Sequence, residues 1–165
     1  MSTTATVEYH TELIDGQEIQ KPLPKTLHGI VQARLIVELS KWAGKLRLIV
    51  SSEQDILCGP DRLVPDIVLA GEEGPFENGY IKAEDLELAV EIMSPGQTFS
   101  DLLSKCERLS HCGTRTCWMI WPKKRKAWVY SAPEQEVSSF TFRGHKILLS
   151  VLFEGLDRYE KLGAI

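Results

Sequence analysis

The chain has 165 residues, of which 43% are hydrophobic and 25% charged, and its formal net charge is −4 at neutral pH. These proportions are those of ordinary globular proteins, so they exclude a disordered or fibrous chain. The negative net charge excludes a protein that coats nucleic acid through bulk positive charge, but it permits a local basic patch. The length predicts a single domain over residues 1–165, with an N-terminal hairpin at about 9–20 and a core at about 26–153.

Features that the sequence lacks predict the compartment. No apolar run approaches the ~18–20 residues that a membrane helix needs, so no membrane partner is expected. The segment Met1–Val7 has neither the charged nor the apolar region of a signal peptide. The cysteines form no CxxC pair, and their spacing matches no common zinc site, which predicts four reduced thiols in a cytoplasmic protein. These cysteines are Cys58, Cys106, Cys112 and Cys117.

The first elements in chain order are a hairpin and a helix. Asp15-Gly16 is a turn dipeptide, because both positions tolerate positive φ, and it predicts the hairpin at about 9–20. Apolar residues at steps of three and four then predict an amphipathic helix from Thr26 to about Ala43. Thr26 is expected to cap this helix, and Gly44 is expected to end it in a left-handed conformation.

Extended segments follow this helix. An exposed, turn-rich loop at 71–80 is expected to separate the last two of them, which are predicted to pair with each other. The segments predicted as strands are 46–50, 54–58, 64–70 and 86–93.

The C-terminal half predicts a second helix and further strands. The helix is expected over about 100–112, ended by Gly113. A strand hairpin is expected over 118–130, and one or two more strands over 140–153. This order of elements predicts an α/β (α+β) fold.

Two acidic residues lie in strands that otherwise look buried. Asp66 follows Pro65 in VPDIVLA, and Glu91 stands near the end of LELAVEIM. Burying a carboxylate is costly, so each needs a hydrogen-bonded cap, a salt bridge or a metal. On neighbouring strands the two could jointly hold a hard divalent cation such as Mg²⁺. The alternative is that each lies at a strand end and points into solvent.

Lys105 lies on the predicted second helix, one turn after Asp101. At this spacing an Asp–Lys pair forms a surface ion pair worth ~0.2–0.5 kcal/mol. The functional alternative is that the helix aims the ammonium of Lys105 at the two carboxylates, where it would stabilise charge that develops on a phosphate.

Four blocks of the sequence resemble the Uma-type restriction-endonuclease family within the PD-(D/E)XK nuclease superfamily. The first three are Glu12–Ile19, Leu27-His28-Gly29 with its helix, and Pro65-Asp66. The fourth is LELAVEIMSPGQTFSDLLSKCERLSHCGTRTCWMIWP, which begins at Leu86. The blocks follow the family in order and spacing over about residues 9–130.

The resemblance implies a restriction-endonuclease-like core, in which a mixed central sheet is flanked by helices. It assigns Asp66 and Glu91 as catalytic metal ligands, with the backbone carbonyl of Ile92 as a further ligand. The simplest superfamily pattern has its lysine two residues after the glutamate, where this chain has Met93. The Uma-type variant has a lysine on the following helix, and Lys105 matches it.

Other positions match the family less closely. Leu109 stands where the family usually has a tyrosine, and Trp121 stands where it usually has an acidic or polar residue. These departures put substrate contacts in doubt. Glu12 and His28 match family positions, and for both the sequence leaves a structural role and a role in the site open.

The densest basic run of the chain is Lys123, Lys124, Arg125 and Lys126, flanked by Trp121 and Trp128. It could contact backbone phosphates, with an indole available for stacking. The alternative is a solvated hairpin turn whose charges keep a sheet edge soluble.

The sequence therefore predicts an Mg²⁺- or Mn²⁺-dependent endonuclease that hydrolyses DNA phosphodiester bonds through Asp66, Glu91 and Lys105. The alternative is a catalytically inactive nuclease-fold module for binding or assembly, acting with a partner protein. A third reading is a nuclease that needs a targeting protein. Cleavage of both DNA strands by one small site also favours a homodimer. This expectation comes from the reaction and not from a pattern in the sequence.

Overall fold

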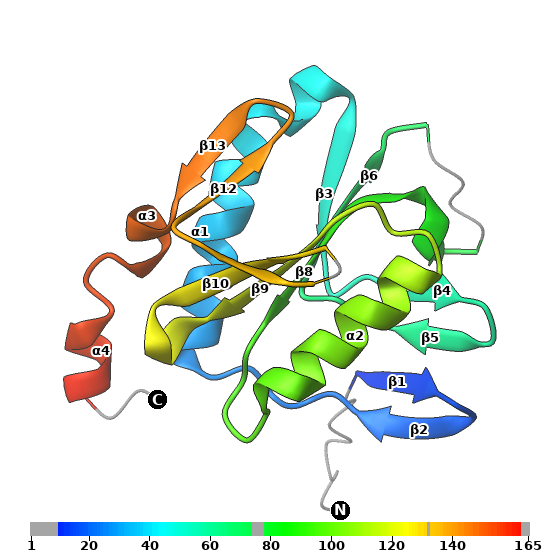
Figure 1. The fold of residues 1–165 in the computed structure, drawn as a ribbon, viewed down its shortest axis with the longest axis horizontal. Coiled ribbons are helices and arrows are strands. Elements are labelled where there is room, and N and C mark those ends of the chain that lie inside the picture. Colours follow the sequence, from blue (N-terminus) through cyan, green and yellow to red (C-terminus); the bar gives the residue numbers. More distant parts are fainter. Residues whose placement is uncertain (1–9, 74–77, 132, 163–165) are drawn as a thin grey trace, which may run out of the picture.

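A six-stranded mixed sheet forms the centre of the computed structural model, which describes residues 10–73, 78–131 and 133–162 (Figure 1). Its strand order is β11-β10-β9-β8-β6-β3, with β8 and β9 parallel and every other neighbouring pair antiparallel. The predicted α/β (α+β) class with a mixed central sheet is confirmed. The strands are β3 (Leu48–Ser52), β6 (Ile67–Gly71), β8 (Leu86–Ile92), β9 (Cys117–Trp121), β10 (Lys126–Tyr130) and β11 (Gln135–Val137).

The expectations for Met1–Val7 and for part of the loop at 71–80 lie outside the described residues. The predicted pairing of the two central strands is confirmed, with Ile67 opposite Val90. Four consecutive residues of β6, from Ile67 to Ala70, are at most 1% exposed. A strand that is buried on both faces needs an element packed on each side of the sheet.

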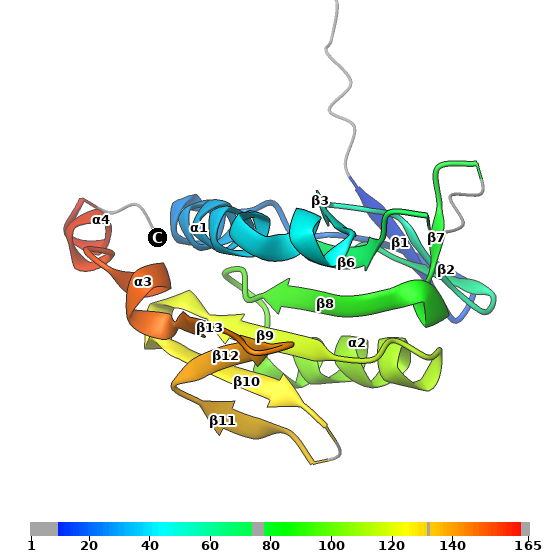
Figure 2. The ribbon, with the colours of Figure 1, turned by 90° about the horizontal axis from the view of Figure 1, so that it is seen from above.

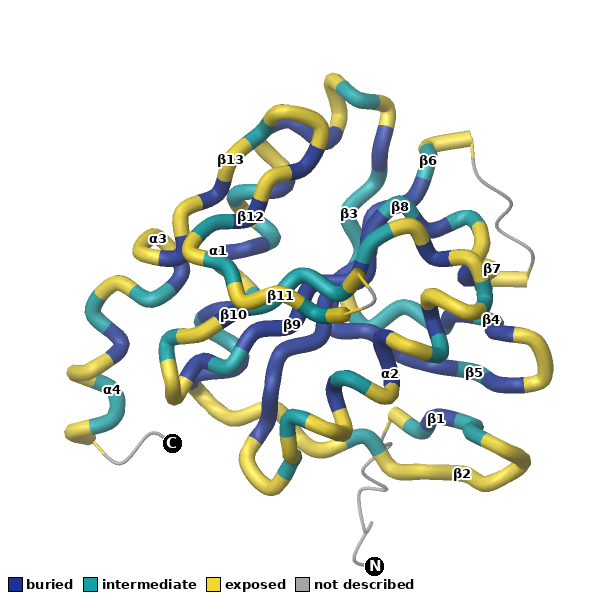
Figure 3. Tube along the Cα trace, in the orientation of Figure 1, coloured by how far each residue is buried: buried dark blue, intermediate teal, exposed yellow. Residues whose placement is uncertain are grey.

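Helices α1 (Thr26–Ala43) and α2 (Phe99–His111) supply those two layers and lie on opposite sides of β8 (Figure 2). The apolar stripe of α1 packs with β12 (Ser139–Phe142) and β13 (His145–Leu148) against one face. The inner side of α2 covers the other face. Figure 3 shows the central strands as a continuous buried region.

The predicted N-terminal hairpin is confirmed, and Asp15 and Gly16 have φ values of 52° and 76°. It joins a second sheet with the order β2-β1-β5-β4-β7. This sheet holds Glu12 against the core, because the amide of Val64 donates a hydrogen bond of 2.8 Å to its Oε1. Strands β5 and β7, of three and two residues, are too short to predict from a pattern. The five strands are β1 (Thr11–Ile14), β2 (Gln17–Gln20), β4 (Ile56–Cys58), β5 (Asp61–Leu63) and β7 (Ile81–Lys82).

Two predictions about the ends of α1 are wrong. Lys25 is the N-cap in place of Thr26, and its side chain makes no capping hydrogen bond. Gly44 is right-handed, with φ −59°, because the chain continues into a 3₁₀ turn over Gly44–Leu46. The left-handed residue is Arg47, with φ 56°.

The C-terminal prediction is correct only in part. Residues 140–148 fall in the hairpin of β12 and β13, but the chain then forms two short helices. Helix α3 (Leu149–Phe153) packs on α1, and Arg34 of α1 donates hydrogen bonds to the carbonyls of Leu152 and Glu154. These contacts satisfy backbone groups that a third strand would need a sheet neighbour to satisfy. Helix α4 (Asp157–Lys161) follows.

The prediction of four reduced thiols is wrong for two of them. Cys58 at the end of β4 and Cys112 after α2 form a disulfide, with their Cα atoms 5.4 Å apart. They are separated by 54 residues, so spacing along the chain carries no signal of the pair. Cys106 and Cys117 are free and buried. No helix in the described part of the chain is long and apolar enough to cross a membrane.

Candidate active site

Asp66 and Glu91 come together where β6 begins and β8 ends. The two strands are antiparallel, so the residue before Ile67 lies beside the last residues of β8. The amide of Asp66 donates to the Val90 carbonyl at 3.1 Å, and the amide of Ile92 donates to Asp66 Oδ2 at 2.5 Å. The two acidic side chains are 1% and 2% exposed. The alternative in which each points into solvent at a strand end is therefore wrong.

Lys105 reaches the same place from the middle of α2. Its ammonium lies 2.9 Å from Glu91 Oε2 and 2.8 Å from Glu12 Oε1. The surface pair with Asp101 does not form, because Asp101 closes a capping box with Thr98 at the start of α2. The cap starts α2 at Phe99, and the helical spacing then puts Lys105 on the face packed against the sheet.

Asp66 has a second set of partners on the α1 side. The ammonium of Lys21 lies 2.8 Å from Asp66 Oδ1, and Nε2 of His28 lies 3.2 Å from the same oxygen. Lys21 also bridges to Glu53 at 2.7 Å. The side-chain amide of Gln32 donates to the Asp66 carbonyl and to Glu53, at 2.9 Å and 3.1 Å.

No pattern in the sequence predicts three of these partners, namely Lys21, Gln32 and Glu53. They belong to three separate segments, and no motif or spacing links them. Gln32 lies one turn after His28 on α1, which is the only periodic signal that could have drawn attention to it.

The environment moves the pKa values of the two acids in opposite directions. For Asp66, burial by itself would raise the pKa, but the hydrogen bond from His28 and the charge of Lys21 outweigh burial and lower it. For Glu91, burial raises the pKa to about 8, in spite of the nearby Lys105 ammonium. Burial would lower the pKa of Lys105, but Glu91 and Glu12 reverse that effect and keep the ammonium charged.

The donor atoms of this cluster suit a hard divalent cation. Oε1 of Glu91 is buried and accepts no hydrogen bond from any described residue, although the Lys105 ammonium is 2.9 Å away. Mg²⁺ prefers carboxylate oxygens, and it commonly takes one or two of them together with several waters. The described residues contain no cluster of three His, Cys, Asp or Glu side chains placed for a metal. Protein ligands would therefore be Asp66, Glu91 and a backbone carbonyl such as that of Ile92.

Comparison with known proteins identifies the family. A family model described as "Uma2: Putative restriction endonuclease" matches residues 4–160. The chain belongs to the Uma2 family. The resemblance expected from the four sequence blocks is thus confirmed, and membership supports a nuclease function in general.

A solved structure shares the fold of this Uma2 chain. It is described as a "putative nuclease belonging to DUF820" from Anabaena variabilis, and it superposes with a TM-score of 0.72. The two sequences are 22% identical, and the match covers 87% of this chain and 89% of the other. No curated protein matches the chain.

The two departures from the Uma2 pattern have different surroundings. Leu109, at the usual tyrosine position, is fully buried and belongs to the hydrophobic cluster between α2 and the sheet. Trp121 is half-buried and lines a cavity beside the site. Neither departure removes Asp66, Glu91 or Lys105.

The basic run has only part of its charge available for nucleic acid. Arg125 pairs with Asp157 and Glu160 of α4, at 2.8 Å and 3.2 Å. Lys126 pairs with Glu136 at 3.2 Å. Lys124 lies over the ring of Trp121, 4.1 Å from its centroid. Lys123 is exposed and lines the same cavity as Trp121.

The candidate site is reached from one side through a separate cavity of about 290 Å³. Its wall includes Lys21, His28, Glu53 and Asp66. Glu91 and Lys105 do not line this cavity and are only 2% and 8% exposed. A ligand that enters the cavity therefore meets the Asp66 half of the cluster first.

Proposed function

We propose that the chain is a divalent-metal-dependent endonuclease that hydrolyses phosphodiester bonds of DNA, with Asp66, Glu91 and Lys105 as its catalytic residues. One observation carries the proposal. Asp66 just before β6, Glu91 of β8 and Lys105 of α2 converge on one buried point, where Glu91 Oε1 accepts no hydrogen bond from the described residues and has only the Lys105 ammonium 2.9 Å away. Buried oxygens that accept no hydrogen bond are rare in folded proteins, and a divalent cation bound here would satisfy this one.

Asp66 and Glu91 would hold the cation, and the Ile92 carbonyl would be the third protein ligand. When bound, a divalent cation polarises the phosphate and lowers the pKa of a bound water. The chain's own part is to fix the ligands. Ile92 N orients Asp66 through its 2.5 Å hydrogen bond, and the Lys105 ammonium orients Glu91.

Lys105 would also stabilise negative charge that develops on the phosphate. A fixed cation in a water-poor site stabilises such charge more than it would in water. Glu12 acts here as a positioning residue, because it holds the ammonium at 2.8 Å and is itself held by the amide of Val64.

A plasmid-nicking assay tests the proposal. Purified protein with Mg²⁺ or Mn²⁺ is expected to convert supercoiled plasmid to the open-circular form, and chelation by EDTA is expected to stop the conversion. Glu91→Ala should lower the rate about 10³-fold or more, because it removes a proposed metal ligand and one of the two carboxylates that hold Lys105.

The matched control is Glu87→Gln on the same strand. Glu87 pairs with Arg115 and Arg143 at 3.2 Å and 3.0 Å, away from the cluster, so nicking should be unchanged. Equal activity of wild type and Glu91→Ala would show that the assigned site is wrong. If the folded wild type shows no nicking with either metal, the chain is instead an inactive nuclease-fold module.

A further inference from the structure

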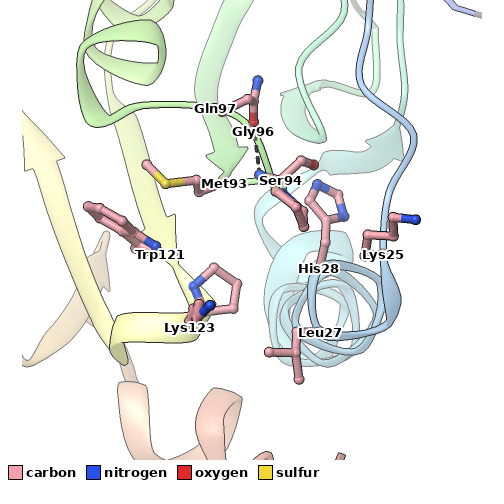
Figure 4. A pocket seen from close by; sticks show the side chains of 11 residues that line it. Lys25, Leu27, His28, Met93, Ser94, Gly96, Gln97, Trp121 and Lys123 are labelled. Atoms are coloured by element: carbon pink, nitrogen blue, oxygen red, sulfur yellow. Dashed lines mark hydrogen bonds between the residues drawn. The ribbon is translucent and has the colours of Figure 1, made fainter. Parts of the chain in front are cut away.

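A cavity of about 300 Å³ opens beside the candidate site, between the start of α1, the turn after β8 and the turn after β9 (Figure 4). Its wall includes Lys25, Met93, Trp121 and Lys123. It shares His28 with the cavity that leads to Asp66. The volume is at the lower end of the range for small-molecule sites, which is about 300–1,000 Å³.

The imidazole of His28 has one nitrogen that needs a partner. The side chain is 3% exposed, and its Nδ1 makes no hydrogen bond with any described residue. Nε2 faces the Asp66 carboxylate at 3.2 Å, so Nε2 carries the hydrogen and Nδ1 is left as an acceptor. His28 lines this cavity, and a hydroxyl or an N–H group of a ligand is the kind of donor that its Nδ1 would accept from.

Positive charge surrounds the same opening. Lys25 and Lys123 are exposed, and neither forms an ion pair within the described ranges. Lys25 is also the N-cap of α1, where no side chain caps the helix and no acidic residue occupies the first turn. Uncapped amides and the helix dipole at this end favour an anion.

Flat apolar surface completes the wall. The indole of Trp121 and the thioether of Met93 both line the side of the cavity away from His28 (Figure 4). Lys124 covers one face of the Trp121 ring, and a nucleobase would stack on the other face, an interaction with little dependence on sequence. The wall thus combines a hydrogen-bond acceptor, two unpaired ammonium groups and an aromatic surface.

We propose that this cavity binds one unpaired nucleotide of the substrate strand, next to the phosphate that is cut. Lys25 and Lys123 would contact its phosphate, Trp121 its base, and His28 Nδ1 would accept from a base amine or a sugar hydroxyl. A cavity of this size admits a base only after the base leaves the stack, so the preferred substrate has an unpaired or extruded nucleotide here. This proposal rests on the proposed nuclease function, which makes the neighbouring Asp66–Glu91–Lys105 cluster the place where the strand is cut.

Binding is tested without metal, in EDTA, with deoxyadenosine monophosphate as the probe and calorimetry as the readout. The nucleotide is expected to bind about tenfold or more tightly than deoxyadenosine and than inorganic phosphate, because both the base and the phosphate have partners. Lys25→Ala combined with Lys123→Ala should weaken binding about tenfold or more, and Trp121→Leu should weaken it roughly fivefold or more.

The control is Lys45→Ala combined with Lys146→Ala, which removes the same charge from exposed positions outside the cavity. This control should bind the nucleotide within about twofold of wild type. No binding of the nucleotide, equal losses in the two double variants, or phosphate binding as tight as nucleotide binding would each overturn the proposal.

The two proposals fail in different ways. Glu91→Ala should keep nucleotide binding in EDTA even though it loses nicking, because Glu91 does not line this cavity. If the wild type binds the nucleotide but never nicks plasmid, only the nuclease function fails. If it nicks plasmid but the cavity variants bind the nucleotide like wild type, only the nucleotide subsite fails.

Discussion

Asp66 and Glu91 lie at neighbouring strand ends, yet the protein surrounds them in opposite ways. Asp66 accepts hydrogen bonds from Ile92 N, Lys21 and His28, and its pKa is lowered. Glu91 has only the Lys105 ammonium, keeps one oxygen without a hydrogen bond among the described residues, and has its pKa raised to about 8. Asp66 is thus already held by the folded chain, whereas under the proposed function Glu91 would gain its second partner when a cation binds.

The largest expected effect is a difference in stability between two isosteric substitutions. Asp66→Asn leaves Lys21 and His28 facing a neutral amide, and should lower the free energy of unfolding by about 3–5 kcal/mol. Glu91→Gln keeps the shape of a side chain whose pKa burial already raises, and it leaves Lys105 paired with Glu12 at 2.8 Å, so it should change stability by less than about 1 kcal/mol. Urea unfolding of both variants measures the difference, and equal losses would remove the proposed contrast.

The next effect concerns the disulfide that anchors α2, the helix that brings Lys105 to Glu91. The bond closes a loop of 54 residues, so Cys112→Ser should lower the stability of the oxidised protein by about 2–4 kcal/mol. Thermal unfolding with and without a reducing agent measures this. The wild type should lose the same amount on reduction and the variant should lose nothing further; a wild type that is insensitive to reduction would contradict the expectation.

A divalent cation should stabilise the folded protein through its contact with the Glu91 carboxylate. At a free Mn²⁺ concentration of 100 times its dissociation constant, the gain should be about 2.7 kcal/mol. Glu91→Gln should abolish this gain and Glu87→Gln should retain it. A gain that survives in Glu91→Gln would place the cation elsewhere.

The smallest effect should come from Lys21, which already supplies positive charge to Asp66. Lys21→Met removes that charge and leaves the carboxylates of Asp66 and Glu53 more attractive to a cation, so Mn²⁺ should bind roughly tenfold more tightly. Calorimetric titration measures the change. Lys146→Met, on exposed surface, is the control, and weaker Mn²⁺ binding in Lys21→Met would show that the ammonium supports the cation and does not compete with it.

Glu91 and its partner Lys105 could be predicted from the sequence, but most of the residues that surround Asp66 could not. A carboxylate in an apolar strand needs a partner, and this rule singled out Asp66 and Glu91 before any contact was known. Lys105 followed from its position on the next helix and from the family resemblance. Lys21 and Glu53 lie outside the helices and strands and belong to no motif, and only the folded chain brings them to Asp66.

The same limit explains which features of the fold were predicted. Long periodic segments such as α1 and strongly apolar strands such as β6 were predicted, because their hydrophobic pattern is complete within one short stretch of sequence. The Cys58–Cys112 bond and the short strand β5 depend on segments that meet only through packing. Helix α3 was missed because its run of apolar residues fits a strand as well as a helix, and its packing on α1 decides between them.

The proposed function depends most on a cation that joins Asp66 to Glu91. Crystals soaked in Mn²⁺ and measured for anomalous scattering test it most directly. The account predicts one strong anomalous peak in contact with a carboxylate oxygen of Asp66 and with Glu91 Oε1, and no such peak in crystals of Glu91→Gln. Density for Mn²⁺ only at surface carboxylates, or an identical peak in Glu91→Gln, would contradict it.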